Sequence, residues 1–395
     1  MLTIQSPGKY RIALLHLGFR PFFLATSCFS VIAMLLWAWI YHAGHTFVFP
    51  NLPATLWHAH EMIFGYTLGV IAGFLLTAVR NWTNVQTARG WTLLVLVSLW
   101  WVARMAMLTH TPWAWSLAAV CDLGFDIALV AAVTYPIVRV RQWKQMGVVA
   151  LVLSVAIANA LFYAGLLGVL HEGVAMSITL GLNGAILLVL MMGRRVIPFF
   201  IEKGLDIPTL VNRIWLDNSV LALMVILIVM EMANMASLAA VIAAFIGMLL
   251  VIRLKDWHRP ALWQKPLLWS LYVAFAWLAL GFILKALSFF GFAPEPLALH
   301  AFSVGGLGLI TYSMMCRVTL GHTGRNVFAP PAALKWLLAL INVGAILRVF
   351  LPWLLPVYTG LWIGLSQLAW IGAFIGFVWI FSKMLVLPRT DGQYG

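Results

Sequence analysis

The residues best suited to chemistry are histidines and charged side chains that stand inside or beside long apolar segments. His58, His60 and Glu61 lie together at the start of an apolar run that continues to residue 79 without another charge. A run of this length can cross a bilayer as a helix. Imidazole and carboxylate groups are costly there, so we expect this cluster to pair, to coordinate a metal or to face water.

The spacing of the histidines is compatible with a haem site. A haem held between membrane helices takes imidazoles at one depth from different helices, and His300 lies at the same expected depth as His58 and His60. Two residues span about 200° of a helix, so only one of His58 and His60 is expected to face a given iron. The alternative is that these histidines hydrogen-bond loops or water at the membrane surface.

Charges at similar depth on other apolar segments allow two interpretations. Asp122 and Asp126 are one turn apart and share a helix face, while Arg104, Lys285 and Arg348 lie in three further segments. In one interpretation these groups form salt bridges between helices. In the other, the basic residues hold haem propionates while the acids conduct protons or bind a cation.

A second group of polar residues is expected at the opposite end of the segments. His16 and His322 stand among arginines in HLGFRPFF and RVTLGHTGR, and they could bind an anion or a second metal. His322 lies about 30 Å from His300 if one helix joins them, so the two cannot share a metal. The alternative is the ordinary excess of basic residues on the cytoplasmic side.

Composition defines the class of protein that must position these residues. Hydrophobic residues make up 64% of the 395 residues and charged residues 9%, with a mean hydropathy of +1.00. These values predict a single integral-membrane helical domain over residues 1–395. The net charge of +13 then reflects basic loops, and no nucleic-acid partner is expected. The three cysteines fall inside apolar runs, which predicts buried thiols.

Apolar runs bounded by charge, Pro or Gly predict an all-α fold of about twelve spans. If both termini are cytoplasmic, only Arg104, Lys285 and Arg348 face outward, which leaves 24 − 3 = 21 basic residues inside. The spans are expected at 21–42, 57–79, 91–109, 114–138, 146–168, 174–193, 214–235, 237–254, 267–290, 297–316, 333–355 and 358–384.

Five ordered motifs carry a resemblance to a known family. HLGFRPFF, WHAHEMIFGY, AGFLLTAVRNWT, GRRVIPFF and RVTLGHTGR occur in this order between residues 16 and 325, and together they resemble the NnrS family of bacterial membrane proteins. The resemblance implies a multi-pass protein of the bacterial inner membrane that contains haem b and copper. It also implies a role in the response to nitric oxide and nitrosative stress, linked to denitrification.

The candidate site residues combine the spacing with this resemblance. We expect haem ligation by His300 and by His58 or His60, with Arg104, Arg348 and Trp57 as further cofactor-binding residues and His322 as a further metal ligand. Nitric oxide is the expected partner, within the lipid bilayer, and the sequence identifies no electron donor. Two other functions are considered: a secondary transporter of a small solute or metal ion, and a haem-copper enzyme that reduces nitric oxide.

Overall fold

The fold is known from a computed structural model that describes residues 12–44, 52–109 and 111–395. Within these ranges the chain is 81% helical and contains no strand, which confirms the predicted all-α class. The predicted contributions of Lys9 and Arg11 to the basic side lie outside the described residues. Cys28, Cys121 and Cys316 are free thiols, the last two buried, as the apolar runs predict.

Every predicted span corresponds to a helical segment of the described chain. Eleven segments are long and apolar enough to cross a membrane, and α4 is apolar but shorter. The helices of the first half are α1 (Phe19–Ala43), α2 (Ala54–His60), α3 (Leu68–Thr83), α4 (Gly90–Ala106), α5 (Pro112–Arg139), α6 (Met146–Leu166) and α7 (Gly173–Leu205). Those of the second half are α8 (Ile214–Met232), α9 (Ala236–Trp257), α10 (Pro266–Phe289), α11 (Glu295–His300), α12 (Leu309–His322), α13 (Leu334–Val349), α14 (Leu351–Leu354) and α15 (Thr359–Val386).

Two helices continue well past their predicted ends. We placed the sixth span at 174–193 and the tenth at 297–316, whereas α7 extends to Leu205 and α12 to His322. Hydropathy falls at Arg194 and at Arg317, but long basic side chains can turn their charged ends toward water while the backbone stays helical. The connecting loops are therefore shorter than the roughly twenty residues that the sequence suggested.

Two spans contain a π-helical segment directly after a histidine. The span that begins at Ala54 passes from α2 into η1 (Glu61–Thr67) and then α3, and the span that begins at Glu295 passes from α11 into η4 (Ala301–Gly308) and then α12. π-Helical turns are rare and occur frequently at functional sites. His60 and His300 are the residues that immediately precede them.

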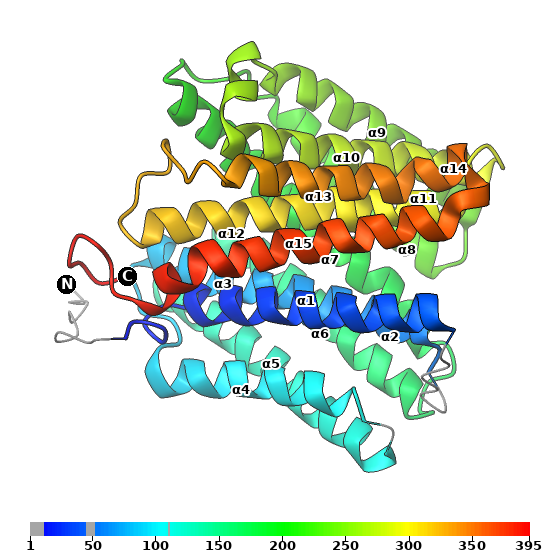
Figure 1. Cartoon of the computed structure of the whole chain (residues 1–395), viewed down its shortest axis with the longest axis horizontal. Helices are drawn as coiled ribbons and strands as arrows, with labels where there is room; N and C mark the ends of the chain where they lie inside the picture. The colour runs from blue at the N-terminus through cyan, green and yellow to red at the C-terminus, as the bar shows by residue number, and fades with distance from the viewer. Residues whose placement is uncertain (1–11, 45–51, 110) are drawn as a thin grey trace. The chain divides into compact units, whose positions relative to one another are not determined.

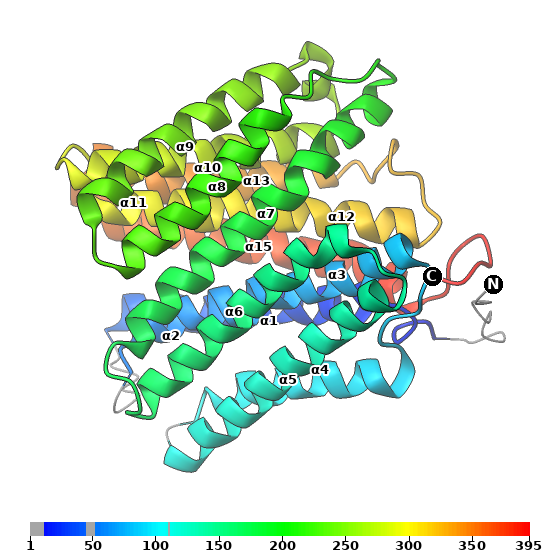
Figure 2. The ribbon, with the colours of Figure 1, turned by 180° about the vertical axis from the view of Figure 1, so that it is seen from behind.

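The chain divides into two compact units, with boundaries inside α7, α12 and α15 and in the loop between α12 and α13. The first comprises residues 1–185, 315–327 and 374–395. In it, α1 packs along α3, and α4 pairs with α5, as the blue and cyan ribbons of Figures 1 and 2 show. Its interior is aromatic near the start of α1, where the rings of Phe22 and Phe125 lie 5.7 Å apart.

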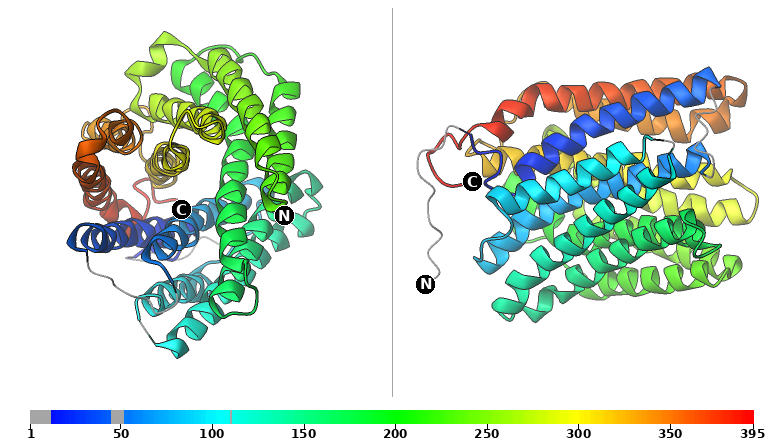
Figure 3. Two further views of the ribbon diagram at one scale, coloured as in Figure 1. Left: turned by 90° about the vertical axis from the view of Figure 1, so that its right-hand side faces the viewer. Right: turned by 90° about the horizontal axis from the view of Figure 1, so that it is seen from below.

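The second unit comprises residues 186–314 and 328–373. Here α9 packs against both α8 and α10, and η4 packs against α10 and α13; the neighbouring green and yellow-green ribbons of Figures 2 and 3 are α8 and α9. The indole of Trp277 donates a hydrogen bond to Asn342 Oδ1 at 2.8 Å, which links α10 to α13. Gly305 of η4 permits this packing, since a Cβ there would lie 2.4 Å from the Trp277 ring.

Candidate functional site

Seven polar side chains meet inside the first unit, on four neighbouring spans, and we refer to them as the polar cluster. None is more than 2% exposed, although all lie within apolar helices. The members are His60, Glu61, Arg104, Asp122, Asp126, Asn159 and Tyr163. Polar groups buried this deeply in a membrane span are expected to bond to one another or to serve a function.

Arg104 of α4 is the cationic centre of the polar cluster. One terminal nitrogen lies 3.0 Å from Glu61 Oε2, and the other forms a very short contact with Asp122 Oδ2. Tyr163 of α6 donates a further hydrogen bond to Asp122 Oδ2 at 3.0 Å. These contacts confirm that Arg104 takes part in salt bridges between helices, and they occupy both ends of its guanidinium fork.

His60 bridges two sides of the polar cluster. Its Nδ1 lies 3.0 Å from Glu61 Oε1 and its Nε2 lies 3.1 Å from Asn159 Oδ1. A second hydrogen bond fixes the orientation of the Asn159 amide, because its NH₂ group donates to Asp126 Oδ2 at 2.8 Å. Both ring nitrogens of His60 therefore lie within hydrogen-bond distance of an oxygen atom.

The polar cluster contains more acidic than basic side chains. The carboxyl groups of Glu61, Asp122 and Asp126 face one arginine, Arg104, and one histidine, His60. Asp122 Oδ1 and Asp126 Oδ1 are buried and accept no hydrogen bond from the described residues. Because an uncompensated buried charge is costly, the arrangement can hold one further proton or a cation.

The π-helical turn of η1 helps to assemble the polar cluster. A Cβ at Gly65 would lie 2.8 Å from the Phe29 ring, 2.9 Å from Glu61 Oε2 and 3.0 Å from the Arg104 guanidinium. Glycine therefore allows the carboxylate and the guanidinium to approach over its backbone. The indole of Trp100 donates to the Gly65 carbonyl at 3.0 Å and holds α4 against this turn.

The other candidates on α2, His58 and Trp57, are not members of the polar cluster. The imidazole of His58 is half-buried and stacks on Trp37 of α1, with ring centroids 4.5 Å apart and planes 8° from parallel. Trp57 is fully buried in an apolar group with Ile40 and Trp115. His58 and His60 thus contact different helices, as their spacing predicts.

Two candidates lie in the second unit. His300 ends α11, and its Nδ1 lies 2.7 Å from the Pro296 carbonyl oxygen. Since that oxygen can only accept, Nδ1 carries a proton and donates it to this hydrogen bond. Arg348 is half-buried in the last turn of α13. The third basic residue considered, Lys285, forms an ion pair with Glu231 of α8 at 2.5 Å.

His322 and His16 belong to the first unit but not to the polar cluster: His322 ends α12, and His16 lies just before α1. The ring of His322 packs 5.6 Å from that of Phe19, and its carbonyl oxygen accepts a hydrogen bond from Arg389 at 3.3 Å. His16 stacks on Tyr394 at 5.0 Å. Burial, together with the charge of Arg20, lowers the pKa of His16 below its usual value. Among the described residues, no three His, Cys, Asp or Glu side chains form a metal-binding group.

Sequence reasoning overlooked two members of the polar cluster, Asn159 and Tyr163. They stand four residues apart on α6 and therefore share a helix face. The sequence pattern that could have identified them is two polar residues one helical turn apart inside an apolar span. The same pattern identified Asp122 and Asp126.

These features define a class of protein, a polytopic all-α membrane protein with a buried ionised cluster in its first unit. The family model described as NnrS protein matches residues 13–389. The chain therefore belongs to the NnrS family, which makes it a membrane protein related to the nitric-oxide response. A comparison with curated proteins gave no match.

Proposed function

We propose that this chain is a haem-containing protein of the bacterial inner membrane that acts in the response to nitric oxide and nitrosative stress. Family membership supports the link to nitric oxide, and the apolar helices support residence in a membrane. Nitric oxide is uncharged and partitions into lipid, so it can reach a cofactor inside the helices. A haem iron there supplies a binding site for nitric oxide.

The observation that carries the haem proposal is the orientation of His300. Its Nδ1–H donates to the Pro296 carbonyl oxygen, and this hydrogen bond fixes the orientation of Nε2, the other ring nitrogen. Metal-ligating imidazoles are commonly fixed in this way by a hydrogen bond from the other ring nitrogen. A π-helical segment begins at the next residue, as is frequent at functional sites. His300 is therefore the residue that we expect to hold the haem iron.

Of the two histidines of α2, His58 is the better candidate for binding a metal. Both nitrogens of His60 are engaged by Glu61 and Asn159, so iron would have to displace a hydrogen bond of a buried cluster. The ring of His58 instead packs flat against Trp37. Arg348 is proposed to hold a propionate and Trp57 to support the cofactor. Arg104 could hold a propionate only by giving up one of its ion pairs with Glu61 and Asp122.

Copper is proposed as a second metal, with His322 as a candidate ligand. This part of the proposal rests on the family resemblance and on the placement of His322 near the end of α12. Softer or additional ligands would be needed for a stable copper site. Metal analysis of the purified protein tests copper separately from haem.

The first experiment is the absorption spectrum of detergent-purified protein, oxidised and dithionite-reduced, with and without nitric oxide. A reducible Soret band that shifts with nitric oxide supports the proposal. We expect His300→Ala and His58→Ala each to lower haem content or change the spectrum. His258→Ala is the matched control, because His258 is exposed and its Nε2 accepts a hydrogen bond from Trp263.

A full haem content and an unchanged spectrum in His300→Ala would reject His300 as a ligand. The absence of any Soret band after expression with adequate haem would reject the haem protein itself.

One observation favours a second candidate function, a transporter that couples solute movement to protons or cations. The polar cluster holds three buried carboxylates with one arginine and one histidine, and Glu61 is the first residue of a π-helical segment. Buried ionisable groups of this kind occur in proton and ion pathways. Uptake of solute by proteoliposomes that contain pigment-free protein would support it. A haem-copper enzyme would instead consume nitric oxide when an electron donor is supplied.

A further inference from the structure

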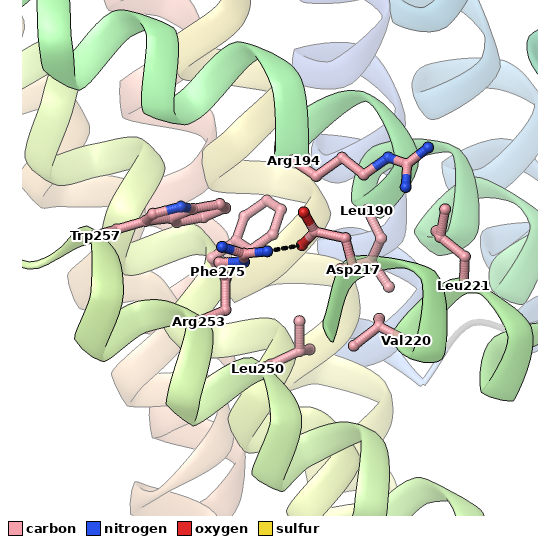
Figure 4. Close-up of a pocket in the computed structure, with 9 residues that line it drawn as sticks. All are labelled: Leu190, Arg194, Asp217, Val220, Leu221, Leu250, Arg253, Trp257 and Phe275. Atoms are coloured by element: carbon pink, nitrogen blue, oxygen red, sulfur yellow. Dashed lines mark ion pairs between the residues drawn. The ribbon is translucent and has the colours of Figure 1, made fainter. Parts of the chain in front are cut away.

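The second unit contains a small cavity between α7, α8, α9 and α10 that the haem proposal does not use. Its volume is about 10 Å³, which is room for roughly one water molecule or one oxygen atom. Figure 4 shows the side chains that line it. They are Leu190, Arg194, Asp217, Val220, Leu221, Leu250, Arg253, Trp257 and Phe275.

Arg253 forms the floor of this cavity and is only 3% exposed. Its NH2 pairs with Asp217 and also donates to the Arg213 carbonyl oxygen at 2.9 Å. Its guanidinium lies 5.7 Å from the centre of the Trp257 ring. Its Nε, however, is buried and finds no partner among the described residues. A buried N–H of a charged group is costly to leave unpaired, so it calls for an acceptor.

Positive charge is in excess around the cavity. Arg194, Arg213 and Arg253 face Asp217 and Asp256, giving 3 − 2 = +1. Arg213 is paired with Asp256 at 2.8 Å. Arg194 enters from α7 and donates to the neutral amide of Asn218 at 2.9 Å. The missing acceptor is therefore expected to carry negative charge.

The size of the cavity limits what this acceptor can be. A whole polyatomic anion does not fit into about 10 Å³, but one oxygen of an oxyanion does, with the rest of the group beside Arg194. Arginine suits such a ligand because its fork binds phosphate oxygens. Asp217 is near the start of α8 and Arg253 near the end of α9, so the cavity lies within about one turn of the helix ends.

We propose that this cavity binds one oxygen of a phosphate group, with Arg194 and Arg253 as the binding residues. A membrane lipid is the source that the surroundings favour. Ile214 and Trp215 at the start of α8 are 64% and 58% exposed, and exposed tryptophan is typical of the level of lipid headgroups. Basic pockets between membrane helices bind acidic headgroups. Free phosphate offers the same oxygens and is distinguished by experiment.

The test compares Arg194→Gln with Arg195→Gln. Arg195 is the next residue on α7, is exposed and does not line the cavity, so its variant removes the same charge from the same region. Each full-length protein is purified in detergent with phosphatidylglycerol or phosphatidylcholine, and the retained lipid is counted by native mass spectrometry. The thermal transition of each variant confirms that it is folded.

We expect the unaltered chain to retain phosphatidylglycerol in preference to phosphatidylcholine. Arg194→Gln should weaken this retention about tenfold, the usual effect of losing one charge-assisted hydrogen bond, while Arg195→Gln changes it little. Inorganic phosphate is then titrated in the absence of lipid. If it binds and Arg194→Gln abolishes that binding, the oxyanion site stands and the source is free phosphate.

Two results would overturn the proposal. Equal loss of lipid in the two variants would mean that only general surface charge attracts it. Retention of neither phosphatidylglycerol nor phosphate would mean that a water molecule fills the cavity. Both outcomes are independent of haem content.

Discussion

Arg104 connects three spans through two carboxylates, so its role can be measured at a single residue. Glu61 and Asp122 are both at most 1% exposed and would lose their main cation if Arg104 were neutral. Removing one partner of a buried ion pair commonly costs about 3–5 kcal/mol because the other charge stays buried. We expect Arg104→Gln to lower the free energy of unfolding by about this amount.

The measurement is the thermal transition of the detergent-purified variant, together with its yield as a single species. Arg139→Gln is the control, because Arg139 is exposed at the end of α5 and bonds only to Tyr135 in the contacts described. Equal transitions for the two variants would show that the Arg104 pairs contribute no more than a surface charge.

His16 gives a prediction about pH. Its pKa in the folded chain is below the ordinary value of 6.5, because burial and Arg20 disfavour the charged ring. The unfolded chain therefore binds the proton more readily, and His16 lowers stability as the pH falls below 6.5. Above that pH it has no such effect.

Thermal transitions recorded above and below pH 6.5 test this sign. We expect His16→Gln to reduce the loss of stability on the acidic side, whereas His258→Gln, at an exposed position, leaves it as it is. An equal acid-induced loss in His16→Gln and in the unaltered chain would contradict the prediction.

Part of the candidate site was predictable from residue spacing. The four-residue interval placed Asp122 and Asp126 on one face, and the two-residue interval separated His58 from His60. The partners of Arg104 were not predictable, because hydropathy gives the depth of a residue but not the rotation of its helix. The same limit hid the bridge through Asn159, which depends on how α5 and α6 turn toward α2.

At the scale of elements, the π-helical turn η1 depends on Gly65. A methyl group there would meet Phe29, Glu61 and Arg104 at 3.0 Å or less, in a region where the cluster allows little movement. We expect Gly65→Ala to destabilise the chain by about 1–3 kcal/mol, the usual cost of overpacking.

Gly124→Ala is the matched control, because Gly124 is also helical and its nearest neighbour would lie 3.9 Å from a new Cβ. There, the better helix propensity of alanine predicts a neutral effect or a gain of up to about 1 kcal/mol. The measurement is the thermal transition temperature of each variant, which we expect to be lower for Gly65→Ala than for Gly124→Ala. Similar temperatures would mean that the turn adapts to the methyl group.

The existence of the spans was predictable and their local geometry was not. The fourth span was placed at 114–138 and α5 covers Pro112–Arg139, since a long, mostly apolar segment indicates a membrane helix even with Asp122 and Asp126 inside it. A π-helical turn leaves the same composition as an α-helix, because it changes hydrogen bonding and not polarity. The adjacent glycines Gly305 and Gly306 both fall inside η4.

At the scale of the whole molecule, the distribution of basic residues predicts the orientation in the membrane. The loops at the two ends of α7 provide a direct test, because Glu172 and Thr209 are both exposed. With cytoplasmic termini, Glu172→Cys should react with a membrane-impermeant maleimide in intact cells of a strain with a permeable outer membrane. Thr209→Cys should react only after the inner membrane is opened.

The unaltered chain is the blank, since its native thiols are buried or half-buried. The reverse labelling pattern would invert the predicted topology, and labelling of both sites in intact cells would mean that α7 does not cross the membrane.

The ion pairs of Arg104 also have a consequence for biogenesis. At 17 residues, α4 is shorter than the eleven candidate spans of the described chain. An arginine opposes the insertion of a segment by up to about 2.5–3.5 kcal/mol, the cost at the helix centre, and Arg104 lies in the last turn of α4. Glu61 is synthesised before α4 and Asp122 directly after it. The translocation machinery is therefore expected to release α4 into lipid together with α5, as a hairpin whose charges are already matched.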